Sequence, residues 1–136
     1  MTTCLRFCQC VTPKTVQKTD TLVLDNLWLI IGEYKKKVSP SGQPGVGDAF
    51  LKWVLTNRSN PQRCEQVSIT QISENEFAEF PKSEALEKFD RSDRKFVAVA
   101  LAHPHHPPIT NAVDSDWRDF QDALAEYGVQ IEFLCP

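Results

Sequence analysis

Short strand-like segments alternate along this chain with longer segments whose apolar residues recur at helical spacing. Strands are expected at Val67–Thr70, Pro108–Val113 and Val129–Phe133. Helices are expected from Asn26 to Val38, from Ala49 to Asn57, near Ser83–Lys88, from Asp93 to Ala102, and from Trp117 to a stop at Gly128. Strands separated by helices favour parallel pairing through right-handed crossovers. The sequence therefore predicts an α/β fold around a small, mainly parallel sheet.

Local signals set the expected boundaries of these elements. Asp25 is expected to cap the first helix, and Asp48 the second. Residues 58–66 are polar and are interpreted as a linker. Residues 1–20 fit both a strand and a helix. Leu5, Phe7 and Val11 could alternate as in a strand, and Cys4, Phe7, Cys8 and Val11 could instead form one face of a helix.

Length and composition limit the classes of protein to consider. A chain of 136 residues predicts a single domain, here 1–136 with an atypical segment at 1–20. A formal charge of −3 means that any contact with nucleic acid requires a local basic patch. No apolar run is long enough for a membrane span, and no signal peptide is recognised. The five unpaired cysteines indicate a reducing, cytoplasmic location.

Four carboxylates lie at or near the ends of apolar elements. Asp93 opens a helix, Asp114 follows an apolar strand, Asp116 precedes Trp117, and Glu33 lies at the margin of a helix face. Each has an ordinary interpretation: Asp93 and Asp116 as helix-start residues, and Glu33 as a surface residue. Taken together, they are expected to converge at the carboxyl edge of the sheet, where ligands bind in open α/β folds.

Clustered carboxylates repel one another unless cations neutralise them. Their hard oxygen ligands suit Mg²⁺ or Mn²⁺. Metals held in this way activate water and stabilise the leaving oxygen in phosphodiester hydrolysis. The pattern therefore favours a metal-dependent hydrolase with Glu33, Asp93 and Asp114 as catalytic metal ligands, supported by Asp116.

The order of these motifs resembles a PIN domain over most of the chain. The segments that show the resemblance are Ile30-Ile31-Gly32-Glu33-Tyr34, Asp93-Arg-Lys-Phe-Val-Ala-Val-Ala100 and Asp114-Ser-Asp116-Trp117. The resemblance implies a three-layer α/β sandwich and a metal-dependent ribonuclease of the toxin–antitoxin type. It also implies RNA as substrate, an antitoxin protein as a possible partner, and a homo-oligomer.

The chain departs from the family pattern at its start. PIN domains open with an apolar strand that ends in a metal-binding aspartate. The alignment instead makes residues 4–24 the family's first helix and the extended piece after it. The opening strand and its aspartate are then missing, and the fold is expected to be N-terminally incomplete. Three explanations stay open: a truncated or mis-started chain, a degenerate relative, or a Thr2–Val11 strand without the carboxylate. The alternative function is therefore a catalytically inactive PIN-fold module that binds protein or RNA. A further alternative is an unrelated α/β domain.

Basic residues beside the acidic cluster are candidates for an RNA path: Lys35, Arg94, Lys95 and Arg118. Solvated surface charge is the competing interpretation. His103, His105 and His106 flank prolines and are expected in a solvent-exposed loop rather than in a metal site.

Overall fold

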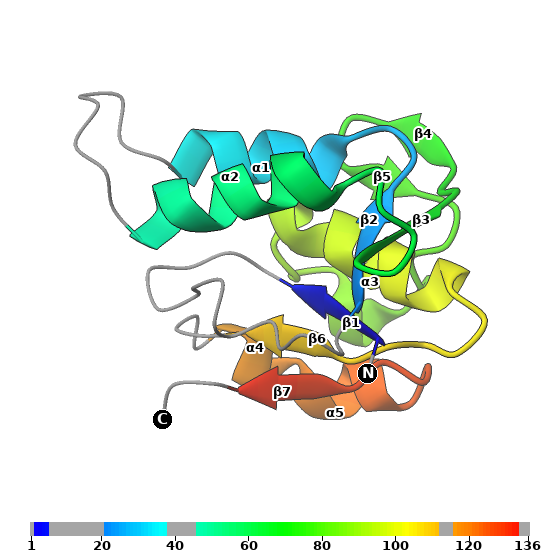
Figure 1. Ribbon diagram of the computed structural model, residues 1–136. Coiled ribbons are helices and arrows are strands. Elements are labelled where there is room, and N and C mark those ends of the chain that lie inside the picture. Colours follow the sequence, from blue (N-terminus) through cyan, green and yellow to red (C-terminus); the bar gives the residue numbers. More distant parts are fainter. Residues whose placement is uncertain (1, 6–20, 38–45, 112–115, 134–136) are drawn as a thin grey trace.

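Five parallel strands form the central sheet of the computed structural model, which describes residues 2–5, 21–37, 46–111 and 116–133 (Figure 1). The strands are β1 (Thr2–Leu5), β2 (Thr21–Asp25), β3 (Cys64–Val67), β6 (Ile109–Asn111) and β7 (Ile131–Phe133). Their order is β3-β2-β1-β6-β7, and every neighbouring pair is parallel. The predicted α/β class with a parallel sheet is confirmed.

The central strand of this sheet comes from the N-terminal segment. Thr2 pairs with Thr21 of β2, and Cys4 pairs with Ile109 of β6. The sheet is therefore not interrupted between β2 and β6, and the expectation of an N-terminally incomplete sheet is wrong. The strand agrees with the third explanation, a strand within Thr2–Val11 that lacks the carboxylate. The alignment that placed a helix from residue 4 is wrong at Cys4 and Leu5, whereas the extended piece at the end of that segment is present as β2.

Five α-helices accompany the sheet among the described residues: α1 (Leu29–Lys37), α2 (Val46–Asn57), α3 (Arg94–Ala102), α4 (Asp116–Asp119) and α5 (Gln121–Ala125). Figure 1 shows α1 and α2 side by side, whereas α4 and α5 lie next to β6 and β7. Helix α2 begins at Val46, so Asp48 lies inside the helix and does not occupy the predicted cap position.

Helix α3 lies in the hydrophobic core. Every residue from Lys95 to Ala100 is buried, and the helix contacts β1, β2 and β6. The small side chains of Ala98 and Ala100 let the helix approach the strands closely, while Phe96, Val97 and Val99 fill the remaining space. The predicted helix at this position is confirmed.

Strand β3 lies further toward the N-terminus than expected. The sequence pattern placed a strand at Val67–Thr70 after a polar linker, but β3 covers Cys64–Val67. Cys64 is buried and pairs with Leu22 of β2. Glu65 is partly buried and Gln66 is exposed, so the strand does not have a fully buried face along its length. This edge strand has few apolar residues, because only part of one face meets the core.

A two-stranded antiparallel hairpin follows, with β4 (Gln71–Ser73) and β5 (Glu76–Phe77). Asn75 turns the chain with a φ of 60°, which asparagine tolerates better than most residues. Two 3₁₀ helices, η1 (Glu84–Leu86) and η2 (Arg91–Asp93), then lead to α3. The hairpin was not predicted, whereas η1 falls within the short helix expected near Ser83–Lys88.

An aromatic cluster fixes α4 against the segment before α3. The Phe89 ring meets Trp117 and Phe120 edge-on, at centroid distances of 4.9 and 5.3 Å, and stacks on Phe80 at 5.9 Å. The expected single helix from Trp117 is interrupted at Phe120, whose backbone leaves helical geometry between α4 and α5. The turn after α5 reaches Gly128 at a φ of 89°, and the last predicted strand is confirmed as β7.

Candidate functional site

The strand order places a change of direction at the centre of the sheet. From β1 the chain adds β2 and β3 on one side, then returns to add β6 and β7 on the other. In open parallel sheets, the crevice outside the carboxyl ends of the two strands at such a point is the usual place for a ligand. Here those strands are β1 and β6, which pair directly.

Asp93 is buried at the start of α3, with only 2% of its surface exposed. It occupies the cap position of the helix, but its side chain makes no capping hydrogen bond. The carboxylate of Asp93 therefore does not cap α3, which was the ordinary interpretation of this residue. Asp25 and Asp93 are the buried aspartates among the residues whose exposure the structure describes.

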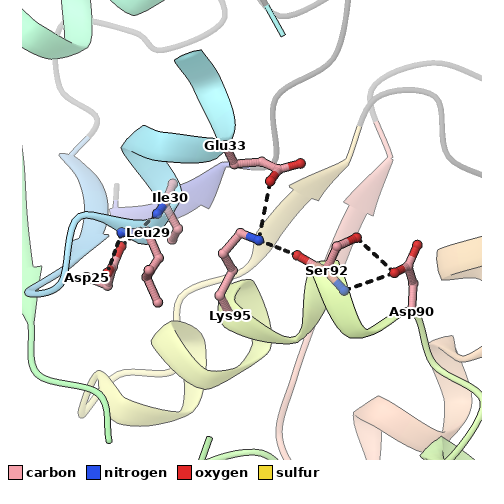
Figure 2. Close-up of polar contacts among 7 residues, drawn as sticks. All are labelled: Asp25, Leu29, Ile30, Glu33, Asp90, Ser92 and Lys95. Carbon is pink, nitrogen blue, oxygen red and sulfur yellow. Dashed lines mark hydrogen bonds and ion pairs between the residues drawn. The ribbon is translucent and has the colours of Figure 1, made fainter. Parts of the chain in front are cut away.

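Glu33 lies next to the start of α3 through an ion pair with Lys95. The Lys95 ammonium is 3.4 Å from Oε2 of Glu33 and also donates to the carbonyl oxygen of Ser92, the residue before Asp93. Figure 2 shows Lys95 extending from α3 between these two partners. The structure thus brings Glu33 of α1 beside the chain segment that carries Asp93.

Lys95 supplies a positive charge at the place where a metal was expected. Its side chain is 8% exposed and that of Glu33 is 15% exposed, so both charged groups are largely withdrawn from water. Opposite charges at this distance offset part of their desolvation cost. Sequence reasoning assigned Lys95 to an RNA path and did not identify this pairing.

Asp25 has a different role at the end of β2. It is fully buried, and its two carboxylate oxygens accept hydrogen bonds from the backbone N–H groups of Leu27, Leu29 and Ile30, at 3.1, 2.8 and 2.9 Å. Figure 2 shows the bonds to Leu29 and Ile30. The predicted helix cap is confirmed, and this carboxylate is committed to the first turn of α1.

The two remaining predicted ligands cannot be placed by their side chains. Asp114 lies outside the described residues, three positions after β6 ends at Asn111. The backbone of Asp116 begins α4, which agrees with its interpretation as a helix-start residue. Within the described ranges, no group of three or more His, Cys, Asp or Glu side chains is arranged to hold a metal ion.

The other predicted RNA contacts differ in how accessible they are. Lys35 is exposed on α1. Arg94 is used inside the fold: Nη2 donates to the carbonyl oxygens of Glu87 and Phe89 at 3.1 and 3.3 Å, and the guanidinium lies over the Phe80 ring at 4.7 Å. Arg118 is exposed, with its guanidinium 4.2 Å from the ring centroid of Phe133.

One histidine of the predicted exposed loop is buried. Nε2 of His103 lies 2.6 Å from Oε2 of Glu65, and Nδ1 accepts a hydrogen bond from the backbone N–H of His105. Both ring nitrogens are therefore occupied, and the residue joins the end of α3 to β3. The expectation of an exposed loop is confirmed for His105 and His106 and is wrong for His103.

A groove of about 670 Å³ lies between the β4–β5 hairpin and the two 3₁₀ helices. Its lining includes Ile72, Phe77, Lys82, Glu84 and Arg91. Of the predicted metal ligands whose side chains the structure describes, neither Glu33 nor Asp93 lines it, although Arg94, the neighbour of Asp93, does. The acidic site and this groove are therefore separate features.

No protein-family model, curated protein or solved structure matches this chain. In the described part of the molecule, no helix combines the length and apolar character that a bilayer span requires.

Proposed function

We propose that this chain is a PIN-like, Mg²⁺- or Mn²⁺-dependent ribonuclease whose site lies at the carboxyl edge of the sheet. The observation that carries the proposal is the approach of Glu33 to the segment that opens α3, where Asp93 is buried. The sheet order supports it, because β6 leads toward Asp114 at the point where the chain changes direction.

The sheet order also supports the three-layer arrangement of the proposal. The connections from β2 to β3 and from β3 to β6 run in opposite directions across the sheet. With right-handed crossovers, such connections cover opposite faces. Helices α1 and α2 would then form one outer layer, and α3 to α5 the other. Helices on opposite faces meet past the strand ends, which fits the contact between Glu33 and Lys95.

The donor set fits a divalent cation in its chemistry, since carboxylate oxygens are the preferred ligands of Mg²⁺ and Mn²⁺. Glu33, Asp93 and Asp114 would hold the ion, and Asp116 would support them. When bound, the ion would activate water and stabilise the leaving oxygen of a phosphodiester. The Lys95 ammonium must move away from Glu33 in this state, because it neutralises the same carboxylate that the metal ion would bind.

The test is RNA cleavage by the full chain in Mn²⁺. Asp93→Asn removes a buried carboxylate while keeping its size, and Asp122→Asn changes an exposed aspartate on α5 as a matched control. The proposal expects cleavage that is lost in Asp93→Asn and kept in Asp122→Asn. Equal cleavage by the two variants would eliminate this site.

A second candidate function is a catalytically silent, metal-free module that binds a partner protein or RNA. The pairing of Glu33 with Lys95 favours it, because the fold then neutralises its own carboxylate. The absence of a carboxylate in Thr2–Leu5 also favours it. An antitoxin-like protein, RNA and a second copy are the partners proposed for a cytoplasmic module of this kind.

Thermal unfolding in Mn²⁺ separates the two functions. A site with a Kd of about 10 µM adds roughly 2.7 kcal/mol to the unfolding free energy when the metal concentration is about a hundred times the Kd. The nuclease proposal expects a clear rise in Tm that Asp93→Asn abolishes. An unchanged Tm in wild type would favour the metal-free module.

A further inference from the structure

Trp28 presents a large aromatic side chain to solvent in an unusual backbone conformation. It is 41% exposed and has a φ of 60°, in the left-handed region that bulky residues rarely adopt. This conformation costs on the order of 1 to 3 kcal/mol. Packing of the covered part of the side chain offsets some of this cost, while the exposed part of the ring is available to a ligand.

The loop that carries Trp28 is held rigidly on both sides. Oδ1 of Asn26 accepts a hydrogen bond from the backbone N–H of Ile69 at 3.0 Å, and Asp25 binds the N–H of Leu27. The carbonyl oxygen of Trp28 accepts from the N–H of Gly32 at 3.0 Å. The backbone that carries Trp28 is therefore held in place before any ligand arrives, which lowers the entropic cost of binding.

Helix α2 adds a cation to this aromatic residue. The guanidinium of Arg58, which follows α2, lies over the Trp28 ring at 5.5 Å from its centroid. Leu55 and Lys52 precede Arg58 at intervals of three residues and are exposed, so they extend the same side of α2 away from Trp28.

The surface around Trp28 is basic, although the chain as a whole is acidic. Among described residues 26–36 and 51–63, the exposed charged side chains are all cationic: Lys35, Lys36, Lys52 and Arg58. Helices α1 and α2 pack against each other, so these cations lie on adjacent elements (Figure 1). No acidic side chain within these two ranges is exposed, so the charge of the two ranges favours contact with a polyanion.

We propose that this basic surface binds single-stranded RNA, with a base stacked on the Trp28–Arg58 pair and phosphates on Lys35, Lys36 and Lys52. An aromatic platform combined with a row of cations is how proteins hold single strands without reading their sequence. A duplex keeps its bases stacked inside and offers no free base to Trp28. The inference rests on the proposed function for the choice of RNA, and it names the single strand as the substrate class.

The composition of the surface favours RNA over an acidic protein. Three of its four cations are lysines, and lysine is depleted in protein–protein interfaces, where arginine is enriched. Lysines suit phosphate contacts, which require positive charge more than fixed geometry. Leu27 and Leu55 are also exposed here and would contact the sugar and base of the strand.

The experiment measures binding of a short labelled oligouridylate by fluorescence anisotropy, in EDTA so that no metal-dependent cleavage occurs. Trp28→Gly removes the ring and suits the left-handed backbone, so folding is retained; Trp28→Tyr keeps an aromatic platform. Ile72→Ala is the matched control, because Ile72 is an exposed apolar residue on β4. Affinity is expected to fall about five- to a hundredfold in Trp28→Gly, to recover largely in Trp28→Tyr, and to be unchanged in Ile72→Ala.

Salt dependence tests the phosphate contacts independently. Three phosphates neutralised on a single strand predict a slope of log K against log salt of about −2. Lys52→Gln should reduce that slope by about 0.7, whereas Lys88→Gln, an exposed lysine elsewhere, should not change it.

Several outcomes would overturn the inference. They are equal affinity of wild type and Trp28→Gly for the oligouridylate, tighter binding of an RNA duplex than of the single strand, or Trp28-dependent binding of polyglutamate in place of RNA. The last result would identify an acidic protein as the ligand. The outcome is distinct from that of the nuclease test: RNA binding in EDTA can persist when Mn²⁺-dependent cleavage is absent, and cleavage can persist when Trp28 has no effect.

Discussion

The ammonium of Lys95 and the carboxylate of Glu33 lie 3.4 Å apart, joining α3 to α1 beside buried Asp93 (Figure 2). This pair is the point at which the two candidate functions differ. In a metal-free module, Lys95 is the permanent counter-ion of Glu33. In a nuclease, it holds the carboxylate in place until a divalent ion displaces it, and metal binding then competes with an internal ion pair.

Replacement of Lys95 by methionine should destabilise the protein. Glu33 would keep a largely buried negative charge without its partner, and the expected loss of unfolding free energy is on the order of 2 kcal/mol. Chemical denaturation measures the loss. In the double variant with Glu33→Gln, the loss should be smaller than the sum of the single losses, because the unpaired charge is gone.

Lys88→Met serves as the control for this pair, since Lys88 is exposed and should change stability by less than about 0.5 kcal/mol. If metal competes with Lys95, the Lys95→Met variant should also show a larger rise of Tm in Mn²⁺ than wild type does. Equal stability losses in Lys95→Met and Lys88→Met would contradict the structural role of the pair.

Removal of the Asp25 carboxylate should be more costly than loss of an ordinary helix cap. Asp25→Ala leaves three backbone N–H groups at the start of α1 without their acceptor, and we expect a loss of about 2 to 3 kcal/mol. Asp25→Asn keeps one acceptor oxygen and should lose about half as much. Denaturant unfolding is the measurement.

Asp90 offers the comparison for Asp25. Its exposed side chain accepts bonds from the N–H and the hydroxyl of Ser92, at 2.9 and 2.8 Å. Because water can replace these contacts, Asp90→Ala should cost less than about 1 kcal/mol. A loss in Asp25→Ala no greater than that in Asp90→Ala would show that burial adds nothing to the Asp25 cap.

Much of the fold could be predicted from periodicity, because the elements concerned have clear faces. Helix α3 and strand β7 fall within their expected residues, and the Asp25 cap was identified from its position before a helical run. Where the apolar signal is short, the boundaries shifted. Strand β3 has only Cys64 as a buried residue, so the neighbouring Val67–Thr70 run attracted the prediction instead.

The N-terminal strand could be predicted only as one of several alternatives, because its stability comes from partners distant in the sequence. The apolar residues of this segment fit both a strand and one face of a helix, and Thr2–Leu5 becomes a strand through pairing with β2 and β6. Local propensity carries no information about such pairing. The β4–β5 hairpin was missed for a different reason, because strands of three and two residues are too short to show an alternating pattern.

The metal site remains a prediction, but two of its residues can be compared with the structure. Sequence spacing gave Asp93 and Glu33, and the structure brings their segments together, but the role of Lys95 was missed. A signal for it existed: Lys95 lies three and four residues before Ala98 and Val99, on the buried stripe of α3. Trp28 had no such signal, because a left-handed backbone at a tryptophan cannot be read from neighbouring residues.

Two glycines should respond in opposite ways to alanine. Gly32 lies within α1, and a Cβ there would meet nothing within 4 Å, so Gly32→Ala should stabilise the protein by about 0.5 to 1 kcal/mol. Gly128 has a φ of 89°, and its Cβ would lie 2.9 Å from Nδ1 of His106. Gly128→Ala should therefore destabilise by about 1 to 2 kcal/mol.

The cost at Gly128 has two parts that a second substitution separates. In the Gly128→Ala background, His106→Ala removes the contact but not the backbone strain, so part of the lost stability should return. Melting temperatures of the four proteins give the coupling. Full recovery would assign the whole cost to the His106 ring and none to the backbone.

Alkaline pH should weaken the fold through Cys64. Burial raises the pKa of the Cys64 thiol from 9.0 to about 11, because the thiolate is poorly solvated inside β3. The unfolded chain therefore loses this proton at a lower pH than the folded chain. The stabilising contribution is complete below about pH 9 and is lost as the pH rises through 11, amounting to on the order of 2 kcal/mol. Cys64→Ala should lower stability at neutral pH yet flatten its decline between pH 8.5 and 11, compared with wild type by denaturant unfolding at each pH. Parallel declines in the two proteins would exclude Cys64 as the responsible group.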